Sequence, residues 1–222
     1  MLTQIYEAAT PQEASALCAL GVDHVGILVG DGAFPREQSL ATAAAIRAAV
    51  RGSGRCSTLF LSADIGRIAG MVGALAPDIV HLGAAIELLT PVDCVSLRRI
   101  MPNASLMRSI PVVGEEAVAL ALSYQGVVDY LLLDSHKPGD AQIGAVGTPH
   151  DWRVSERIVR AVKIPAILAG GLGPENVAEA IRRVRPAGVD SKTRTDVVGT
   201  HTKDLGRVRA FVTAARAAAS QR

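Results

Sequence analysis

The sequence is poor in aromatic residues, which make up only 3% of it, whereas hydrophobic residues make up 49%. The core must therefore consist mainly of Ala, Val, Leu and Ile, a composition that suits buried parallel strands covered by alanine-rich helices. No apolar run approaches the ~18 residues that a membrane-spanning helix needs. We therefore expect a globular protein with no membrane partner.

Cysteine is also scarce, and Cys18, Cys56 and Cys94 lie far apart without Cys-x-x-Cys spacing. An odd number of scattered cysteines does not predict a disulfide framework, so we expect a reducing compartment. Residues 1–4 lack a charged segment followed by an apolar stretch, and we therefore expect no signal peptide. Together these features predict a cytoplasmic protein.

Charge of one sign is not concentrated anywhere in the sequence. The chain has 23 basic and 21 acidic residues, which give a formal net charge of +2 and are scattered along its length. Proteins that bind nucleic acid usually carry a basic stripe, often with interleaved aromatic residues, and the sequence shows no such stripe. Nucleic acid is therefore not an expected partner.

What the sequence does have is a regular alternation of short β-rich runs and longer helical runs. We predict strands at 4–7, 24–29, 58–62, 78–82, within 105–113, at 130–134, at 165–169 and from 188. We predict helices at 11–20, 39–50, 65–75, 91–100, 115–124, 151–162, 174–184 and 205–219.

This alternation favours right-handed strand–helix–strand units and a parallel sheet. Eight such units in 222 residues favour a closed (β/α)8 barrel, the TIM barrel, over an open doubly wound sheet. No linker or shift in composition divides the chain, so we predict that residues 1–222 form one α/β domain.

In such a barrel the active site lies at the carboxyl ends of the strands, and polar residues there are candidates. The candidates at these ends are Tyr6, Glu7, Asp31, Asp64, His81, Arg108, Asp134, His136, Asp190, Lys192, Thr193 and Arg194. Asp31 and Asp64 are equally well explained as helix N-caps. Asp134 is the strongest candidate, because it directly follows a Leu-Leu-Leu run in a strand that should be buried on both faces.

A carboxylate in that position costs several kcal/mol in its ionised form unless it is paired or solvated. The pKa of Asp134 should therefore depend strongly on its surroundings, as a general acid requires. The alternative is a structural, salt-bridged aspartate.

A glycine pair, Gly170-Gly171, follows the predicted seventh strand. Glycines let backbone N–H groups approach an anion closely, and in barrels the loops after strands seven and eight commonly bind phosphate. Lys192 and Arg194, directly after strand eight, would add positive charge. We predict a phosphate site here, although a glycine pair alone also suits a tight turn.

Several motifs of the carboxyl-terminal half occur together in a characteristic order. They are residues 131–135, the glycine-rich stretch 144–148 followed by His150-Asp151-Trp152, residues 165–172, Asn176-Val177, residues 188–190, and Lys203-Asp204 ahead of Phe211. In order and spacing these motifs resemble the phosphoribosylanthranilate isomerase family of tryptophan biosynthesis. The amino-terminal half resembles this family mainly in layout.

The resemblance implies an Amadori rearrangement, in which a phosphoribosyl-amine opens its sugar ring and becomes an aminodeoxyribulose. Asp134 matches the family's general acid, which protonates the ring oxygen. Gly170 and Gly171 match the first set of backbone amides that hold the phosphate. We expect a small phosphorylated substrate and neither a cofactor nor a bound metal. A homodimer is among the assemblies that we expect the chain could form.

The sequence also departs from the family, chiefly near the first strand. The family's Lys-x-Cys-Gly reads Gln4-Ile5-Tyr6-Glu7, so Tyr6 replaces the cysteine that acts as general base. Glu7 is a candidate base, because burial tunes carboxylates for that task. The Ser-Pro-Arg motif after strand two is absent, and Arg36 is the candidate for binding a substrate carboxylate.

Two further departures add polar groups. His81 begins the segment that matches the family's Gln-Leu-His-Gly, and Lys192-Thr193-Arg194 replaces its Ser-Ser-Gly. We therefore expect this last loop to contact an anion through side chains as well as backbone. His81, Arg108 and His136 are predicted to contact the substrate.

Three interpretations stay open. The favoured one is an isomerase with a substituted base. The second is a diverged barrel enzyme that uses the same phosphate site for another phosphorylated sugar or acid, and one version of it holds a metal with His81, Asp134, His136 and Glu7. The third is a non-catalytic anion-binding homologue.

Overall fold

The computed structural model describes residues 1–52, 54–136, 139, 143–144 and 150–221. The strands are β1 (Leu2–Ile5), β2 (His24–Leu28), β3 (Arg55–Phe60), β4 (Ile79–Leu82), β5 (Ser105–Pro111), β6 (Tyr130–Asp134), β7 (Ala166–Leu168) and β8 (Gly188–Ser191). The helices are α1 (Pro11–Ala19), α2 (Leu40–Ala49), α3 (Ile65–Leu75), α4 (Pro91–Ile100), α5 (Glu116–Tyr124), α6 (Trp152–Ala161), α7 (Val177–Val184) and α8 (Leu205–Ala219).

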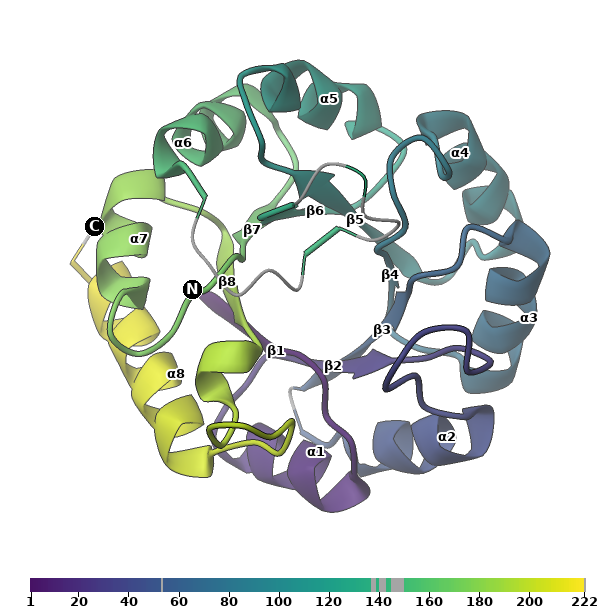
Figure 1. Ribbon diagram of the computed structural model, residues 1–222, viewed down its shortest axis with the longest axis horizontal. Helices are drawn as coiled ribbons and strands as arrows, with labels where there is room; N and C mark the ends of the chain where they lie inside the picture. Colours follow the sequence, from purple (N-terminus) through teal and green to yellow (C-terminus); the bar gives the residue numbers. More distant parts are fainter. Residues whose placement is uncertain (53, 137–138, 140–142, 145–149, 222) are drawn as a thin grey trace.

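The strands are parallel and close into a barrel in sequential order, from β1 to β8. The helices form an outer ring around the strands (Figure 1). This arrangement confirms the predicted (β/α)8 barrel. Within the described residues, no helix has both the length and the apolar character that crossing a membrane would require.

Two strands begin earlier than predicted. β1 ends at residue 5, so Tyr6 and Glu7 follow the strand instead of belonging to it. β3 begins at Arg55, because Cys56 already pairs with Val25 of β2. Both shifts move the predicted strand ends by a few residues but leave the polar candidates on the same side of the barrel.

The connections on either side of α7 also differ from prediction. The predicted helix at 174–184 begins later, at Val177, because the Asn176 side chain folds back and accepts the Gly173 N–H at 2.9 Å. After β8 the chain forms a short 3-10 helix, η1 (Thr193–Thr195), which the sequence did not predict.

β1 closes the barrel by pairing with β2 on one side and β8 on the other. In this register Gln4 lies beside His24 and Asp190. The side chains continue the contact: Gln4 Nε2 donates to Asp190 Oδ1 at 3.1 Å, and Gln4 Oε1 lies 3.0 Å from His24 Nδ1. A buried amide therefore links the two strands that flank β1.

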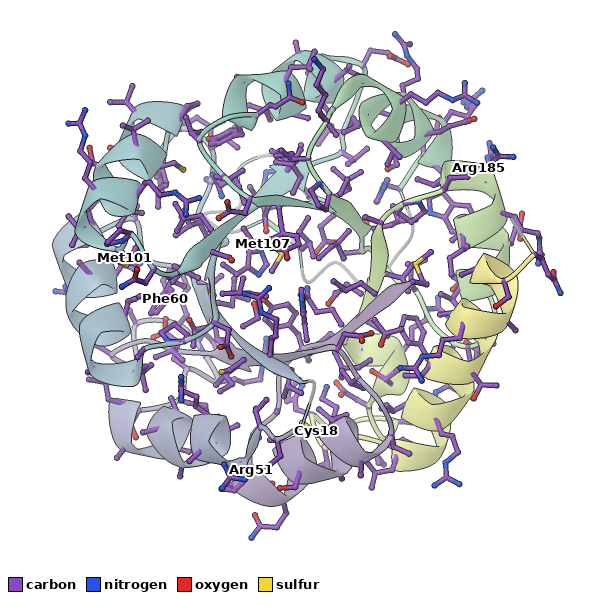
Figure 2. All side chains as sticks on the ribbon, turned by 180° about the vertical axis from the view of Figure 1, so that it is seen from behind. Cys18, Arg51, Phe60, Met101, Met107 and Arg185 are labelled. Atoms are coloured by element: carbon purple, nitrogen blue, oxygen red, sulfur yellow. The ribbon has the colours of Figure 1, made fainter. Side chains whose placement is uncertain are left out.

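The apolar core has two parts. The larger part fills the layer between strands and helices, where Phe60 and Phe211 are buried. The smaller part lies inside the barrel, and Figure 2 shows its Met107 within the ring of strands. Its other members are Ile79, Leu132, Ile167 and Ala169. The (β/α)8 barrel is thus filled with side chains, as is general for this fold.

Hydroxyl and imidazole groups fill another part of the barrel interior. The Tyr6 hydroxyl lies 2.6 Å from Ser57 Oγ and 2.7 Å from His81 Nδ1, and His81 Nε2 lies 2.7 Å from Ser109 Oγ. All four side chains are buried. Gly26 provides the space for this arrangement, because a Cβ atom there would overlap the Tyr6 ring.

We predict that Gly26→Ala lowers the free energy of unfolding by about 1–3 kcal/mol, since the added methyl group forces the Tyr6 ring out of its hydrogen-bonded position. Urea unfolding measures this change. Gly70→Ala on α3 is the matched control, because a Cβ atom there meets nothing within 4 Å. An equal loss in both variants would contradict the role given to Gly26.

Candidate functional site

A pocket of about 770 Å3, including the space open to solvent at its mouth, lies at the carboxyl ends of the strands. Its apolar lining consists of Leu28, Leu59, Leu61, Leu132, Ile143 and Leu172. Its other lining residues are Tyr6, Glu7, Arg36, His81, Ser109, Asp134, Gly170, Gly171, Asp190, Ser191, Lys192, Thr193 and Arg194. Pockets of this size commonly hold small-molecule ligands.

The pocket brings together most of the residues predicted from the sequence, but not Arg108. The Arg108 guanidinium is fully buried and donates to the carbonyl oxygens of Leu82 at 2.8 Å, Ala84 at 2.7 Å and Leu89 at 3.2 Å. It also lies 5.4 Å from the centre of the Tyr124 ring. Arg108 therefore holds the chain after β4 in place, and the structure does not bring it to the pocket.

Asp31, Asp64 and His136 are also not among the residues lining the pocket: Asp64 caps α3, as its alternative interpretation allowed, and Asp31 pairs with Arg67. His136 gives a different picture. Its Nδ1 atom is buried and has no hydrogen-bond partner among the described residues. Most of the glycine-rich stretch 144–148, which carries part of the family resemblance, lies outside the described residues.

Gly170 and Gly171 follow β7 with φ angles of +83° and +62°, in the left-handed region that favours glycine. Among the described residues, no acceptor takes a hydrogen bond from their amide N–H groups. A Cβ atom at residue 170 would lie 2.7 Å from Ser135 Oγ. Asn176 Nδ2 holds this turn by donating to the Gly171 carbonyl at 3.1 Å. The turn therefore presents amide donors at the pocket.

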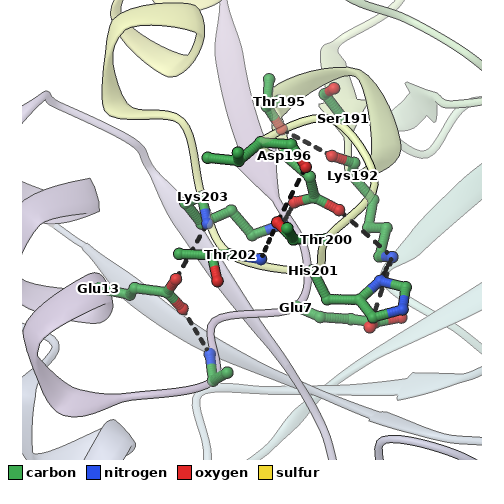
Figure 3. A network of polar contacts seen from close by, with 12 residues as sticks. Glu7, Glu13, Ser191, Lys192, Thr195, Asp196, Thr200, His201, Thr202 and Lys203 are labelled. Atoms are coloured by element: carbon green, nitrogen blue, oxygen red, sulfur yellow. Dashed lines mark hydrogen bonds and ion pairs between the residues drawn. The ribbon is translucent and has the colours of Figure 1, made fainter.

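Lys192 follows β8 and lies within a network of charged groups at the pocket rim (Figure 3). Its Nζ atom is 2.9 Å from His201 Nδ1, 3.4 Å from Asp196 Oδ2 and 3.8 Å from Glu7 Oε2. Asp196 also pairs with the buried amine of Lys203. These contacts hold the Lys192 ammonium group at the rim.

Glu7 and Arg36 form a two-pronged ion pair at the same rim. Arg36 Nε donates to Glu7 Oε2 at 2.8 Å, and Arg36 Nη2 donates to Glu7 Oε1 at 3.2 Å. Burial acts to raise the pKa of Glu7, but the Arg36 hydrogen bonds and the Lys192 charge outweigh it, and the pKa lies below its usual range. Glu7 is therefore held at the rim as a paired, ionised carboxylate.

Asp134 ends β6 and lines the pocket. Its Oδ1 atom accepts the Ser135 N–H at 2.8 Å, and Gly144 passes so close that a Cβ atom there would overlap Oδ2. Burial raises the pKa of Asp134 to about 7, against the lowering effect of the Ser135 N–H. Such a carboxyl group is partly protonated near neutral pH and is able to donate a proton.

Asp190 on β8 is a second buried carboxyl group in the pocket, only 7% exposed. Burial and then the charge of Asp134 raise its pKa to about 8, although the Gln4 hydrogen bond and the Lys203 charge act in the opposite direction. The sequence placed Asp190 at a strand end without giving it a role. A carboxyl pair with raised pKa values is typical of functional sites.

Gln4, Ser57 and Ser109 contribute polar groups to the barrel interior that the sequence did not single out. Alternate residues of a barrel strand face inward, so the two-residue spacing of Gln4 and Tyr6, and of Ser57 and Leu59, could have indicated which side chains face the barrel interior.

Among the residues that the structure describes, no three His, Cys, Asp or Glu side chains lie together as metal ligands would. His81 uses both ring nitrogens in hydrogen bonds.

The fold and the pocket are those of a (β/α)8-barrel enzyme with its site at the carboxyl ends of the strands. The sequence model of the N-(5'-phosphoribosyl)anthranilate (PRA) isomerase family matches residues 5–214, and the chain belongs to this family. An N-(5'-phosphoribosyl)anthranilate isomerase from Afipia carboxidovorans is 32% identical to it, over 99% of this chain and 91% of that protein.

Solved structures of the same family have the same fold. Monomers of a dimeric phosphoribosylanthranilate isomerase from Thermotoga maritima superpose with a TM-score of 0.77 at 23% identity, over 98% of this chain and 100% of that one. A phosphoribosylanthranilate isomerase in complex with reduced 1-(o-carboxyphenylamino)-1-deoxyribulose 5-phosphate has a TM-score of 0.77 at 22% identity, with the same coverage. The resemblance found in the sequence is thereby confirmed.

We predict that the raised pKa of Asp190 makes the stability of the folded protein depend on pH. The carboxyl group binds its proton up to about pH 8 when folded, but only up to about pH 4 when unfolded. Stability should therefore fall as pH rises through this window, because the folded state must give up the extra proton. Asp190→Asn should remove this loss of stability, because asparagine does not titrate, and its Oδ1 atom still accepts the hydrogen bond from Gln4.

The stabilities of the two proteins are compared between pH 6.5 and 8.5. Below that range, the lowered pKa values of buried His24, His81 and His150 make stability rise with pH, which opposes the effect of Asp190. Chemical unfolding should show that the variant gains about 1–2 kcal/mol on the wild-type protein across this interval. Parallel stability curves for the two proteins would contradict the raised pKa.

Proposed function

We propose that the protein catalyses the Amadori rearrangement of N-(5'-phosphoribosyl)anthranilate to 1-(2-carboxyphenylamino)-1-deoxyribulose 5-phosphate. The observation that carries this proposal is the presence in one pocket of the Asp134 carboxyl group and of Gly170 and Gly171, whose amides have no acceptor among the described residues. Membership of the PRA isomerase family supports it independently.

The phosphate group binds at the glycine turn after β7 and at η1 after β8. The N–H groups of Gly170 and Gly171 donate to its oxygens, and those of Thr193 and Arg194 complete the set. Lys192 and Arg194 side chains add positive charge, which favours a dianion at this position.

The anthranilate end occupies the apolar part of the pocket. Leu28, Leu59 and Leu61 provide apolar surface that suits an aromatic ring. Arg36 lines the same pocket and binds the carboxylate with its planar guanidinium group. His81 lies beneath the pocket and fixes the Tyr6 hydroxyl that forms its floor.

Asp134 acts as the general acid. Its protonated form donates to the ring oxygen of the sugar while the bond between C1 and that oxygen breaks, and the nitrogen lone pair forms a C1=N bond. The raised pKa of Asp134 suits this step, because a protonated carboxyl group is then available near neutral pH.

A second candidate function is the same chemistry on a phosphorylated sugar derivative without an aromatic carboxylate. The ion pair between Glu7 and Arg36 favours it, because Arg36 already binds a carboxylate of its own chain. The Glu7 variant described below separates the two substrates.

We further propose that the protein works in the cytoplasm and as a homodimer. The scattered cysteines support the first, and a dimeric relative of the same fold supports the second.

The wild-type protein should consume N-(5'-phosphoribosyl)anthranilate with loss of its anthranilate-type fluorescence, and Asp134→Asn should lower kcat by about 100- to 10,000-fold. Asparagine keeps the size of the side chain but has no acidic proton to give. Titration with the reduced product analogue should show affinity within about threefold of wild type. Fluorescence that persists at micromolar wild-type enzyme, with the analogue still bound, would instead support a non-catalytic binding protein.

Glu7→Gln should lower KM about two- to fivefold and leave kcat unchanged, because the substrate carboxylate no longer competes with a partly exposed ion pair for Arg36. Steady-state kinetics measure the two parameters separately. Glu156→Gln, which breaks an ion pair with Arg160 on α6, is the control. An unchanged KM favours the substrate without a carboxylate, and a collapse of kcat would make Glu7 the base.

A further inference from the structure

An aldose–ketose rearrangement needs a base as well as an acid, because the proton on C2 of the sugar must be removed after the ring opens. We propose that Asp190 is this base and that it works as a pair with Asp134. The inference rests on the proposed function and adds to it the group that takes the C2 proton.

Tyr6 and His81 line the pocket but are engaged elsewhere. The Tyr6 hydroxyl contacts Ser57 and His81, and the remaining His81 nitrogen contacts Ser109. Burial raises the pKa of Tyr6 well above its usual value, so the phenol stays protonated. Burial and the Arg108 charge lower the pKa of His81 to about 3, and both of its ring nitrogens face hydroxyl partners instead of the pocket.

Glu7 is a carboxylate, but its charge is already neutralised. Both of its oxygens accept from Arg36, and Lys192 Nζ lies 3.8 Å away. A carboxylate that two cations stabilise has little tendency to take up a proton. Glu7 therefore suits the binding of charge at the rim and not proton transfer.

Asp190 differs from Glu7 in its partners. Its Oδ1 atom accepts from the neutral amide of Gln4 at 3.1 Å, and Gln4 is fixed in turn by His24. Its Oδ2 atom accepts no hydrogen bond from the described residues, and Asp190 lines the pocket. One oxygen is thus held in place while the other is available to a ligand, and no cation among the described residues pairs with either.

Asp134 ends β6 and Asp190 is the penultimate residue of β8, and these two strands are separated only by β7. Both carboxyl groups have raised pKa values because of burial, and the Asp134 charge adds to the effect at Asp190. Interacting carboxyl groups of this kind titrate as a pair and hold one proton between them over a range of pH. Such a pair holds one protonated and one ionised carboxyl group at the same time, and ionised Asp190, whose pKa is the higher of the two, is the stronger base.

The proton transfers balance within this pair. Asp134 gives its proton to the ring oxygen, and Asp190 takes the C2 proton while the C–H electrons form a C1=C2 bond and the C1=N electrons return to nitrogen. The enolamine becomes the ketone when its C2 hydroxyl proton passes to Asp134 and the Asp190 proton passes to C1. Both carboxyl groups regain their starting states, and no co-reactant is needed.

The test is the activity of Asp190→Asn and Asp190→Ala toward N-(5'-phosphoribosyl)anthranilate. We expect kcat to fall about 1,000-fold in both variants, with the affinity for the reduced product analogue within about threefold of wild type. Formate should restore the activity of Asp190→Ala at least tenfold and in a saturable manner, whereas chloride should not. Rescue by a small carboxylate identifies a lost base and would not follow from a lost structural contact.

Asp31→Asn is the control, because it removes a carboxylate from the same end of the barrel that pairs with Arg67 outside the pocket. Tyr6→Phe should lose less than tenfold. An active wild-type enzyme with Asp190→Asn within tenfold of it, or with Asp190→Ala that formate does not rescue, overturns Asp190 as the base and leaves the proposed function standing. A wild-type protein that does not isomerise the substrate overturns the proposed function itself.

Discussion

The arrangement of the pocket depends on the contact by which Gln4 joins β1 to β8 and β2. The closure of the barrel places Gln4 between Asp190 and His24, and an uncharged amide bridges them. A lysine, which the related family has at this position, would set a cation against Asp190 and keep its pKa low. With glutamine there, burial of the carboxyl group is not offset by a paired charge, and the pKa of Asp190 rises.

The carboxyl groups at the rim of the pocket and those deeper in the barrel have different pKa values. The balance between desolvation and hydrogen bonding explains both. At the rim, Glu7 is also largely buried, but two hydrogen bonds from Arg36 outweigh desolvation and keep it ionised. Deeper in the barrel, each of Asp134 and Asp190 has only an amide group as a donor among the described residues, and desolvation dominates. Positive groups therefore lie at the rim, and the carboxyl pair with raised pKa values lies where chemistry would occur.

The sequence predicted the barrel because strand and helix patterns depend on neighbouring residues alone. It also placed Asp134 and Gly170 at strand ends, and the structure brings both to one pocket. Arg108 was different: it was expected at a strand end but lies in the middle of β5, and its guanidinium group faces the carbonyl oxygens of Leu82 and Ala84 instead of the pocket. The raised pKa of Asp190 was not foreseen either, because it depends on burial inside the closed barrel and on the charge of Asp134, which lies on another strand.

Several other residues of the barrel make room for the ring of Tyr6 or form hydrogen bonds with its hydroxyl group. Its ring needs the absence of a side chain at Gly26, and its hydroxyl needs Ser57 and His81, which in turn needs Ser109. A phenol held by two buried partners on distant strands is part of the packed interior, because moving it toward a ligand would leave those partners unpaired, at about 1–3 kcal/mol each. The tyrosine therefore belongs to the floor of the pocket, and this is why we propose Asp190, whose Oδ2 accepts no hydrogen bond from the described residues, as the base.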